Sequence, residues 1–200
     1  MIYVIKVVAF DLCDVIVKYN NKQYLEYLAK KATFNEKFEE YFDSLDAKVD
    51  AGALRTSVFE DTISRKLSVP KSYISYRNAF EKLGSLDKDV LGIVNHLAKR
   101  YKIVLLSNLG YSQYQVAIRK FIPKNLFYRR FVSCYTKLKK PDNAAYRYMI
   151  GQLNVMPDEI VFIDDKKNNI IAAREAGIKG IVFKNPKQLR KALMELAVHI

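Results

Sequence analysis

The sequence predicts an α/β protein with a Rossmann-like core, a parallel sheet into which a helical segment is inserted after the first strand. Two observations predict this class. Short apolar runs rich in β-branched residues alternate with helical patterns, the order typical of a parallel sheet covered on both faces. The exception is a stretch of about 65 to 70 residues after the first run, which shows helical periodicity and no convincing strand.

The first apolar run, Val7–Phe10, ends abruptly on Asp11. A continuous run of this kind predicts a strand buried on both faces. A carboxylate at the carboxyl end of such a strand lies where open α/β sheets bind their ligands. Taken alone, the run is equally consistent with a solvent-facing Asp11 that merely ends the strand.

The inserted segment, residues 19–86, is predicted to be a small helical cap. Its apolar residues recur at helical spacing, and a turn near Gly52 separates two of the helices. Pro70 opens the last helix, with Gly84 near its end. The predicted domains are therefore a core of residues 1–18 and 87–200 and a cap of residues 19–86.

From Asp87 onward, strands and helices alternate. The expected strands cover 103–108, 131–135, 160–163 and 180–183. The expected helices cover about 89–100, 111–121 and 186–198, with one more after KKPD, which carries Ala145 to Leu153, and another that runs from after Asn169 to Ala176.

Composition and charge narrow the function classes. Half of the 200 residues are hydrophobic and no apolar run approaches the roughly 20 residues that span a bilayer, so we expect a soluble, cytoplasmic protein without a membrane partner. The chain lacks a signal-peptide pattern, and its isolated Cys13 and Cys134 predict reduced thiols. The net charge of +13 favours anionic ligands. A basic, aromatic stretch at 120–140 carries no nucleic-acid-binding motif, so we expect no specific nucleic-acid partner.

Polar residues at the strand ends form a set that can converge on one crevice, because the carboxyl ends of parallel strands share an edge. Crowded carboxylates repel one another unless a divalent cation lies among them, and oxygen ligands suit Mg²⁺. A hydroxyl, an amide and an ammonium group opposite the metal would hold a phosphate. The set comprises Asp11, Ser107, Asn108, Lys140, Asp164 and Asp165.

The segments FDLCDV, LLSN, KKPD and FIDDKKNN closely resemble the four motifs of the haloacid dehalogenase-like hydrolase superfamily. The insertion resembles that superfamily's type 1 cap, and the resemblance covers nearly the whole chain. Cap length and the DD-x-x-x-N form of the last motif are most similar to small sugar-phosphate phosphatases, such as glucose-1-phosphate phosphatase. The resemblance implies a Mg²⁺-dependent phosphatase whose partner is a small phosphorylated metabolite.

The resemblance also implies roles for the residues that match the motifs. Asp11 would be the nucleophile that forms an aspartyl-phosphate. Ser107, with Asn108 beside it, would bind the phosphoryl oxygens, and Lys140 would neutralise nucleophile and phosphate together.

The implied metal ligands are Asp11, the backbone carbonyl of Cys13 and Asp165, with Asp164 assisting directly or through water. Asn169 would anchor the loop rather than touch substrate.

One departure from the family pattern concerns proton transfer. Family phosphatases carry a second Asp two positions after the nucleophile, but here that position is Cys13 and the following residue is Asp14. A thiol with a pKa near 8.5 is a poor base at neutral pH, and losing a general acid and base costs about 10²- to 10⁴-fold in rate. Side chains alternate in an extended segment, so Asp14 is expected to point away from the substrate.

Three function classes follow from these residues. The leading one is a slow phosphatase, and the second is a non-catalytic phosphate-binding or regulatory protein on the same fold. The third, a 2-haloacid dehalogenase, is disfavoured because Asp164 and Asp165 resemble metal ligands that this branch lacks. The sequence leaves the oligomeric state open.

Overall fold

The core of the molecule is a parallel sheet with strand order β5-β4-β1-β6-β7, seen in a computed structural model that describes residues 4–199. All four neighbouring pairs of strands run parallel, which confirms the predicted fold class. The central strand is β1, the apolar run that ends at Asp11. The strands are β1 (Val7–Phe10), β4 (Lys102–Ser107), β5 (Arg129–Val132), β6 (Ile160–Asp164) and β7 (Lys179–Val182).

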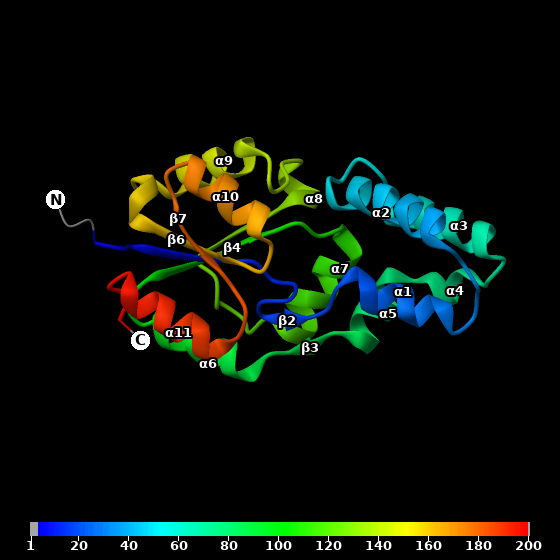
Figure 1. Cartoon of the computed structure of the whole chain (residues 1–200), viewed down its shortest axis with the longest axis horizontal. Coiled ribbons are helices and arrows are strands. Elements are labelled where there is room, and N and C mark those ends of the chain that lie inside the picture. The colour runs from blue at the N-terminus through cyan, green and yellow to red at the C-terminus, as the bar shows by residue number, and fades with distance from the viewer. Residues whose placement is uncertain (1–3, 200) are drawn as a thin grey trace.

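Helices cover both faces of this sheet (Figure 1). In β1, Val7 and Ala9 pack toward one face, while Val8 and Phe10 pack toward the other, because successive strand residues point to opposite sides. All four side chains are fully buried, which explains why the run is apolar throughout. The first face packs against α9 (Asn143–Leu153) and α10 (Lys167–Glu175), and the second against α6 (Lys88–Leu97) and α11 (Pro186–Glu195).

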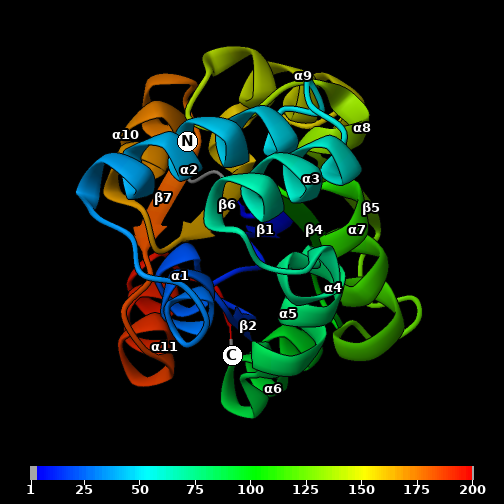
Figure 2. The same cartoon turned by 90° about the vertical axis from the view of Figure 1, so that its right-hand side faces the viewer.

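The helices of the inserted segment lie together at one end of the molecule (Figures 1 and 2). Buried aromatic rings pack between them, and Tyr76 contacts both Phe59, with ring centroids 4.5 Å apart, and Tyr24, at 4.8 Å. Aromatic side chains bury large apolar areas, so this segment has a packed interior of its own. The helices are α1 (Asn21–Ala29), α2 (Glu36–Asp50), α3 (Thr56–Leu67), α4 (Lys71–Ile74) and α5 (Tyr76–Leu83).

Two expectations for the inserted segment were wrong. The helix expected from Pro70 divides at Ser75, whose side chain accepts a hydrogen bond from Asn78 N and so caps α5. The segment also contains a short strand, β3 (Ser85–Leu86), which pairs antiparallel with β2 (Val17–Lys18). A strand of two residues is too short to show alternation. The pair lies next to the predicted domain boundaries at 18/19 and 86/87.

The expected strand at 131–135 was also misplaced. β5 ends at Val132, opposite Ser107 at the end of β4, and the chain then turns into α8 (Ser133–Thr136). The helix expected over 111–121 begins as α7 (Tyr111–Val116) and continues as a π-helix (Ala117–Phe121), and a 3₁₀ turn (Pro157–Glu159) precedes β6.

Between residues 4 and 199, none of the helices is both long and apolar enough to cross a membrane.

Candidate active site

Three carboxylates meet at the carboxyl edge of the sheet. Asp11 directly follows β1, Asp164 ends β6, and Asp165 comes next. Asp11 N donates a hydrogen bond to Ile163 O at 2.9 Å, so the strand pairing itself brings these residues together. One oxygen of each carboxylate lies within 4.8 Å of one oxygen of each of the others. This concentration of negative charge needs a compensating cation.

Part of that compensation is Lys140, which is only 3% exposed. Its Nζ lies 2.9 Å from Asp11 Oδ2 and 2.6 Å from Asp164 Oδ2. Burial alone would lower the pKa of Lys140, but its two carboxylate partners outweigh burial and raise that pKa. The ammonium group therefore stays charged between the two carboxylates.

Asn108 holds the loop that carries Lys140. Its Nδ2 donates to Lys140 O at 2.8 Å, and its Oδ1 accepts from Lys140 N at 2.9 Å. Both ends of the amide are thus engaged by backbone, although Asn108 lines the pocket. These contacts support a positioning role for Asn108, and the phosphate contact expected of it stays a prediction.

The Ser107 hydroxyl is buried and lacks a hydrogen-bond partner in the part of the chain that the structure describes. Ser107 ends β4, the neighbour of β1, and its Oγ has no hydrogen-bond partner among the residues the structure describes. Most buried hydroxyls are hydrogen-bonded, and an unsatisfied one is unfavourable. The Ser107 hydroxyl is therefore left with its donor and acceptor unused at the carboxyl edge of the sheet.

Asp164 and Asp165, adjacent in sequence, differ in their surroundings. Asp164 accepts hydrogen bonds from Asn169 Nδ2 at 2.9 Å on each oxygen and from Lys166 N at 2.8 Å, besides its pair with Lys140. Asp165 has no ion pair or side-chain hydrogen bond within residues 4–199. Burial, with Asp11 and Asp164 nearby, raises the pKa of Asp165 to about 6. Asp165 is therefore the open carboxylate, and with Asp11 it offers the oxygen ligands that Mg²⁺ prefers.

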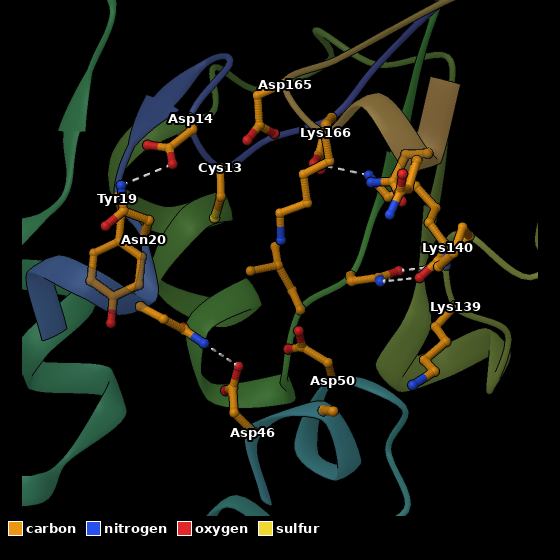
Figure 3. Close-up of a pocket in the computed structure, with 18 of the residues that line it drawn as sticks. Cys13, Asp14, Tyr19, Asn20, Asp46, Asp50, Lys139, Lys140, Asp165 and Lys166 are labelled. Atoms are coloured by element: carbon orange, nitrogen blue, oxygen red, sulfur yellow. Dashed lines mark hydrogen bonds and ion pairs between the residues drawn. The ribbon is translucent and has the colours of Figure 1, made fainter. Parts of the chain in front are cut away.

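Cys13 and Asp14 both line the pocket (Figure 3), and the expectation that Asp14 points away from the substrate stays a prediction. The segment is not extended here, because Asp14 has a positive φ of 55°. Asp14 Oδ2 accepts from Nδ2 of Asn20, the residue that caps α1, at 2.9 Å. Burial, then Asp11 and Asp50, raise the pKa of the Cys13 thiol, which keeps the thiol protonated.

The inserted helices supply the opposite wall of a cavity of about 830 Å³. Asp46 and Asp50 lie four residues apart on one face of α2, on the side of the cavity opposite the carboxyl edge of the sheet (Figure 3). Sequence reasoning missed both residues and also Tyr19. The only signal for the two carboxylates was their helical spacing, which a solvated helix face shows as well.

Comparison with known proteins gives a family match over most of the chain. A family model described as haloacid dehalogenase-like hydrolase matches residues 8–183. A structure of a HAD-family enzyme from Bacteroides thetaiotaomicron is similar with a TM-score of 0.81 at 22% identity, covering 90% of this chain and 94% of the other. The same enzyme has been solved in complex with magnesium and inorganic phosphate.

Two curated relatives match over shorter stretches. Flavin mononucleotide hydrolase 1 of Arabidopsis thaliana is 37% identical over 70 residues, 35% of this chain and 29% of the relative. A phosphorylated carbohydrates phosphatase of Thermotoga maritima is 29% identical over 84 residues, 42% of this chain and 39% of the relative. The matches thus span well under half the length of either relative.

Proposed function

The chain belongs to the haloacid dehalogenase-like hydrolases, and on this premise we propose that it is a Mg²⁺-dependent phosphatase of small phosphorylated metabolites. One observation carries the proposal: Lys140 Nζ lies within 2.9 Å of Asp11 while Asp165, an open carboxylate, lies on the same edge. The phosphatase names of the Arabidopsis and Thermotoga relatives support a phosphate ester as substrate.

In the proposed mechanism, Asp11 is the nucleophile. One oxygen of its carboxylate attacks phosphorus, the bond to the leaving alcohol breaks, and water then hydrolyses the aspartyl-phosphate. Lys140 holds the Asp11 carboxylate in place and offsets the negative charge of the phosphoryl group. The unpaired Ser107 hydroxyl donates to a phosphoryl oxygen.

The oxygen ligands for Mg²⁺ would be Asp11, Asp165 and the backbone carbonyl of Cys13, with Asp164 behind them held by Lys140 and Asn169. A bound Mg²⁺ supplies charge that offsets the repulsion between the carboxylates and the phosphate. The magnesium and phosphate complex of the Bacteroides enzyme supports this assignment.

Proton transfer is the weak point of this site. The leaving alcohol needs a proton and the attacking water must lose one, but Cys13 stands where a carboxylate would serve, and the raised pKa of its thiol makes it a poor base. We therefore propose slow turnover. The same observation favours the second candidate, a phosphate-binding or regulatory protein that has lost catalysis. A 2-haloacid dehalogenase is disfavoured, because Asp164 and Asp165 form with Asp11 a group that could hold a metal ion, and they resemble metal ligands that this branch of the family lacks.

The inserted helices are proposed to act as the cap of this active site, with core residues 1–18 and 87–200 around it. Their contribution to the pocket is polar, because all but one of the α2 side chains that line it are Asp. The leaving group of the substrate is therefore expected to be polar.

The decisive experiment measures phosphate release from a panel of phosphorylated metabolites with and without Mg²⁺. We expect release that requires Mg²⁺ and that disappears in Asp11→Asn. Phosphate release that persists in Asp11→Asn would contradict the proposed nucleophile. Binding of phosphate without turnover of any ester would favour the non-catalytic protein, and halide release from 2-haloacids would favour the dehalogenase.

A further inference from the structure

The cap wall of the pocket carries two carboxylates that differ in what they bind. Asp46 accepts hydrogen bonds from the Tyr76 hydroxyl and from Asn21 Nδ2, the latter at 2.8 Å. Asp50 forms no ion pair and no hydrogen bond to another side chain among the residues described here, although the backbone of Gly110 donates toward it, and it faces the cavity (Figure 3). Asp46 is thus held by two side chains, whereas Asp50 has no side-chain partner among the described residues.

A second observation at this wall is independent of the acidic residues. Tyr19 is 2% exposed and lines the pocket, yet its hydroxyl has no hydrogen-bond partner in the described part of the chain. Its ring is held by an edge contact with Phe80, at 4.6 Å between centroids. The ring extends toward the side of the pocket that Asp46 occupies (Figure 3). A rigid ring with an unpaired hydroxyl indicates a missing hydrogen-bond donor or acceptor.

The electrostatics of the wall favour a cation. Burial raises the pKa of both Asp46 and Asp50, and Asp46 raises that of Asp50 further. The nearby Lys166 opposes these shifts, but it lies beyond ion-pair distance of either carboxylate, and Lys22 and Lys139 at the pocket also form no ion pair with them. Buried carboxylates without a cationic partner gain most from a charged donor.

We propose that this wall binds a primary ammonium group on the alcohol part of the phosphate ester, which makes amino-alcohol or amino-sugar phosphates the preferred substrates. An ammonium group has three N–H donors, and the carboxylates of Asp46 and Asp50, four residues apart on α2, offer it charged acceptors, with the unpartnered Tyr19 hydroxyl lining the same pocket. A neutral hydroxyl in its place has one donor and leaves the carboxylates uncompensated. This inference rests on the proposed phosphatase function, because the phosphate end of the ester is placed at Asp11.

The test compares esters that differ only by an amino or a hydroxyl group. Suitable pairs are glucosamine 6-phosphate with glucose 6-phosphate and 2-aminoethyl phosphate with 2-hydroxyethyl phosphate. We expect kcat/KM to favour the amino member of at least one pair by about tenfold or more. The preference should be lost in Asp50→Asn and reduced in Tyr19→Phe. Glu40→Gln is the matched control, since it removes an exposed carboxylate from the same helix, away from the residues that line the pocket, and should keep the preference.

A binding measurement keeps the inference testable whether or not the protein turns over. Calorimetry on Asp11→Asn with Mg²⁺ should show tighter binding of glucosamine 6-phosphate than of glucose 6-phosphate, and adding Asp50→Asn should abolish the difference. Turnover or binding without an amino preference in either pair would overturn the ammonium site and leave the phosphatase proposal standing. Amino-selective binding without any turnover would uphold the site and remove the phosphatase. If Asp50→Asn fails to fold, the comparison is made with Tyr19→Phe alone.

Discussion

Lys140 Nζ lies 2.9 Å from Asp11 Oδ2, with both residues buried. The contact joins the end of the central strand to a loop that follows α8, and Asn108 fixes that loop through two hydrogen bonds to the backbone of Lys140. Asp11, the proposed nucleophile, is therefore linked through Lys140 to Asn108, and each of the three depends on the others for its place.

Replacing Lys140 tests how much its contacts with the buried carboxylates contribute to the free energy of unfolding. Lys140→Met should lower the free energy of unfolding by about 3–5 kcal/mol in metal-free protein, because it leaves buried carboxylates without their partner. The variant should retain Mg²⁺ binding but bind phosphate more weakly. Denaturant titration and calorimetry measure these effects. Lys139→Met, which also lines the pocket but makes no ion pair among the described residues, is the control. Equal stability of the two variants would contradict the prediction.

Asp165 should make Mg²⁺ binding depend on pH. Its pKa of about 6 means that acidification through that value protonates a proposed ligand, so Mg²⁺ affinity should fall between about pH 7.5 and pH 5. Asp165→Asn should bind Mg²⁺ more weakly at both pH values and show a flatter dependence. Calorimetry at each pH measures this, with Asp89→Asn on α6, distant in the fold, as control. An unchanged affinity in Asp165→Asn would remove Asp165 from the metal site.

The raised pKa of Asp165 also predicts how the stability of the protein depends on pH. A carboxyl whose pKa is raised by folding stabilises the protein most below its ordinary pKa, near 3.9, and this contribution is lost as pH rises through about 6. In the absence of Mg²⁺, thermal unfolding should therefore show a stabilising contribution at low pH that Asp165→Asn lacks. Added Mg²⁺ should raise Tm more at pH 7.5 than at pH 5, because only the ionised carboxylate binds it.

Cys13→Asp should raise phosphatase turnover by about 10²- to 10⁴-fold, the range that general acid–base catalysis supplies. KM should change little, since the phosphate-binding groups are untouched. The double variant Cys13→Asp with Asp14→Gly removes repulsion from Asp14, and glycine suits the positive φ at that position. Steady-state kinetics on one ester compares all forms. A wild type as fast as the double variant would show that proton transfer is already provided.

Ser107→Ala should weaken phosphate binding without lowering the stability of the fold. Its hydroxyl has no partner in the described structure, so its removal should change the free energy of unfolding by less than about 0.5 kcal/mol. Phosphate affinity should fall by about 5- to 10-fold, the value of one hydrogen bond. Ser133→Ala is the matched contrast, because Ser133 Oγ accepts from Leu109 N at 3.0 Å and its loss should cost about 1 kcal/mol. A destabilised Ser107→Ala with unchanged phosphate affinity would contradict this role.

The sequence alone determined that the core is a parallel sheet and which residues lie at its carboxyl edge. Continuous apolar runs such as Val7–Phe10 indicate strands buried on both faces, and parallel strands necessarily bring Asp11, Ser107 and Asp164 to the same edge. Helical periodicity likewise located the insertion. These features are local or follow from topology, so they can be predicted without coordinates.

Only the tertiary structure decided how the edge residues are used. Only the family resemblance separated the roles of the adjacent Asp164 and Asp165, and the structure adds the physical difference: Lys140 and Asn169 engage Asp164 and leave Asp165 open. Asn108 was predicted to bind phosphate, and the structure adds that its side-chain amide hydrogen-bonds to the backbone of Lys140. Hydrogen bonds between segments far apart in the chain make these choices, and no local pattern records them.

The pocket residues Asp46, Asp50 and Tyr19 show most clearly what the sequence could not predict. Asp46 and Asp50 look like any acidic pair on a solvated helix, and Tyr19 looks like a packing residue. Their place opposite Asp11 depends on how α2 docks over the sheet, which is set by the packing of buried side chains from several helices. Periodicity determines which face of a helix is buried, whereas three-dimensional packing determines which residues that helix faces across a cavity.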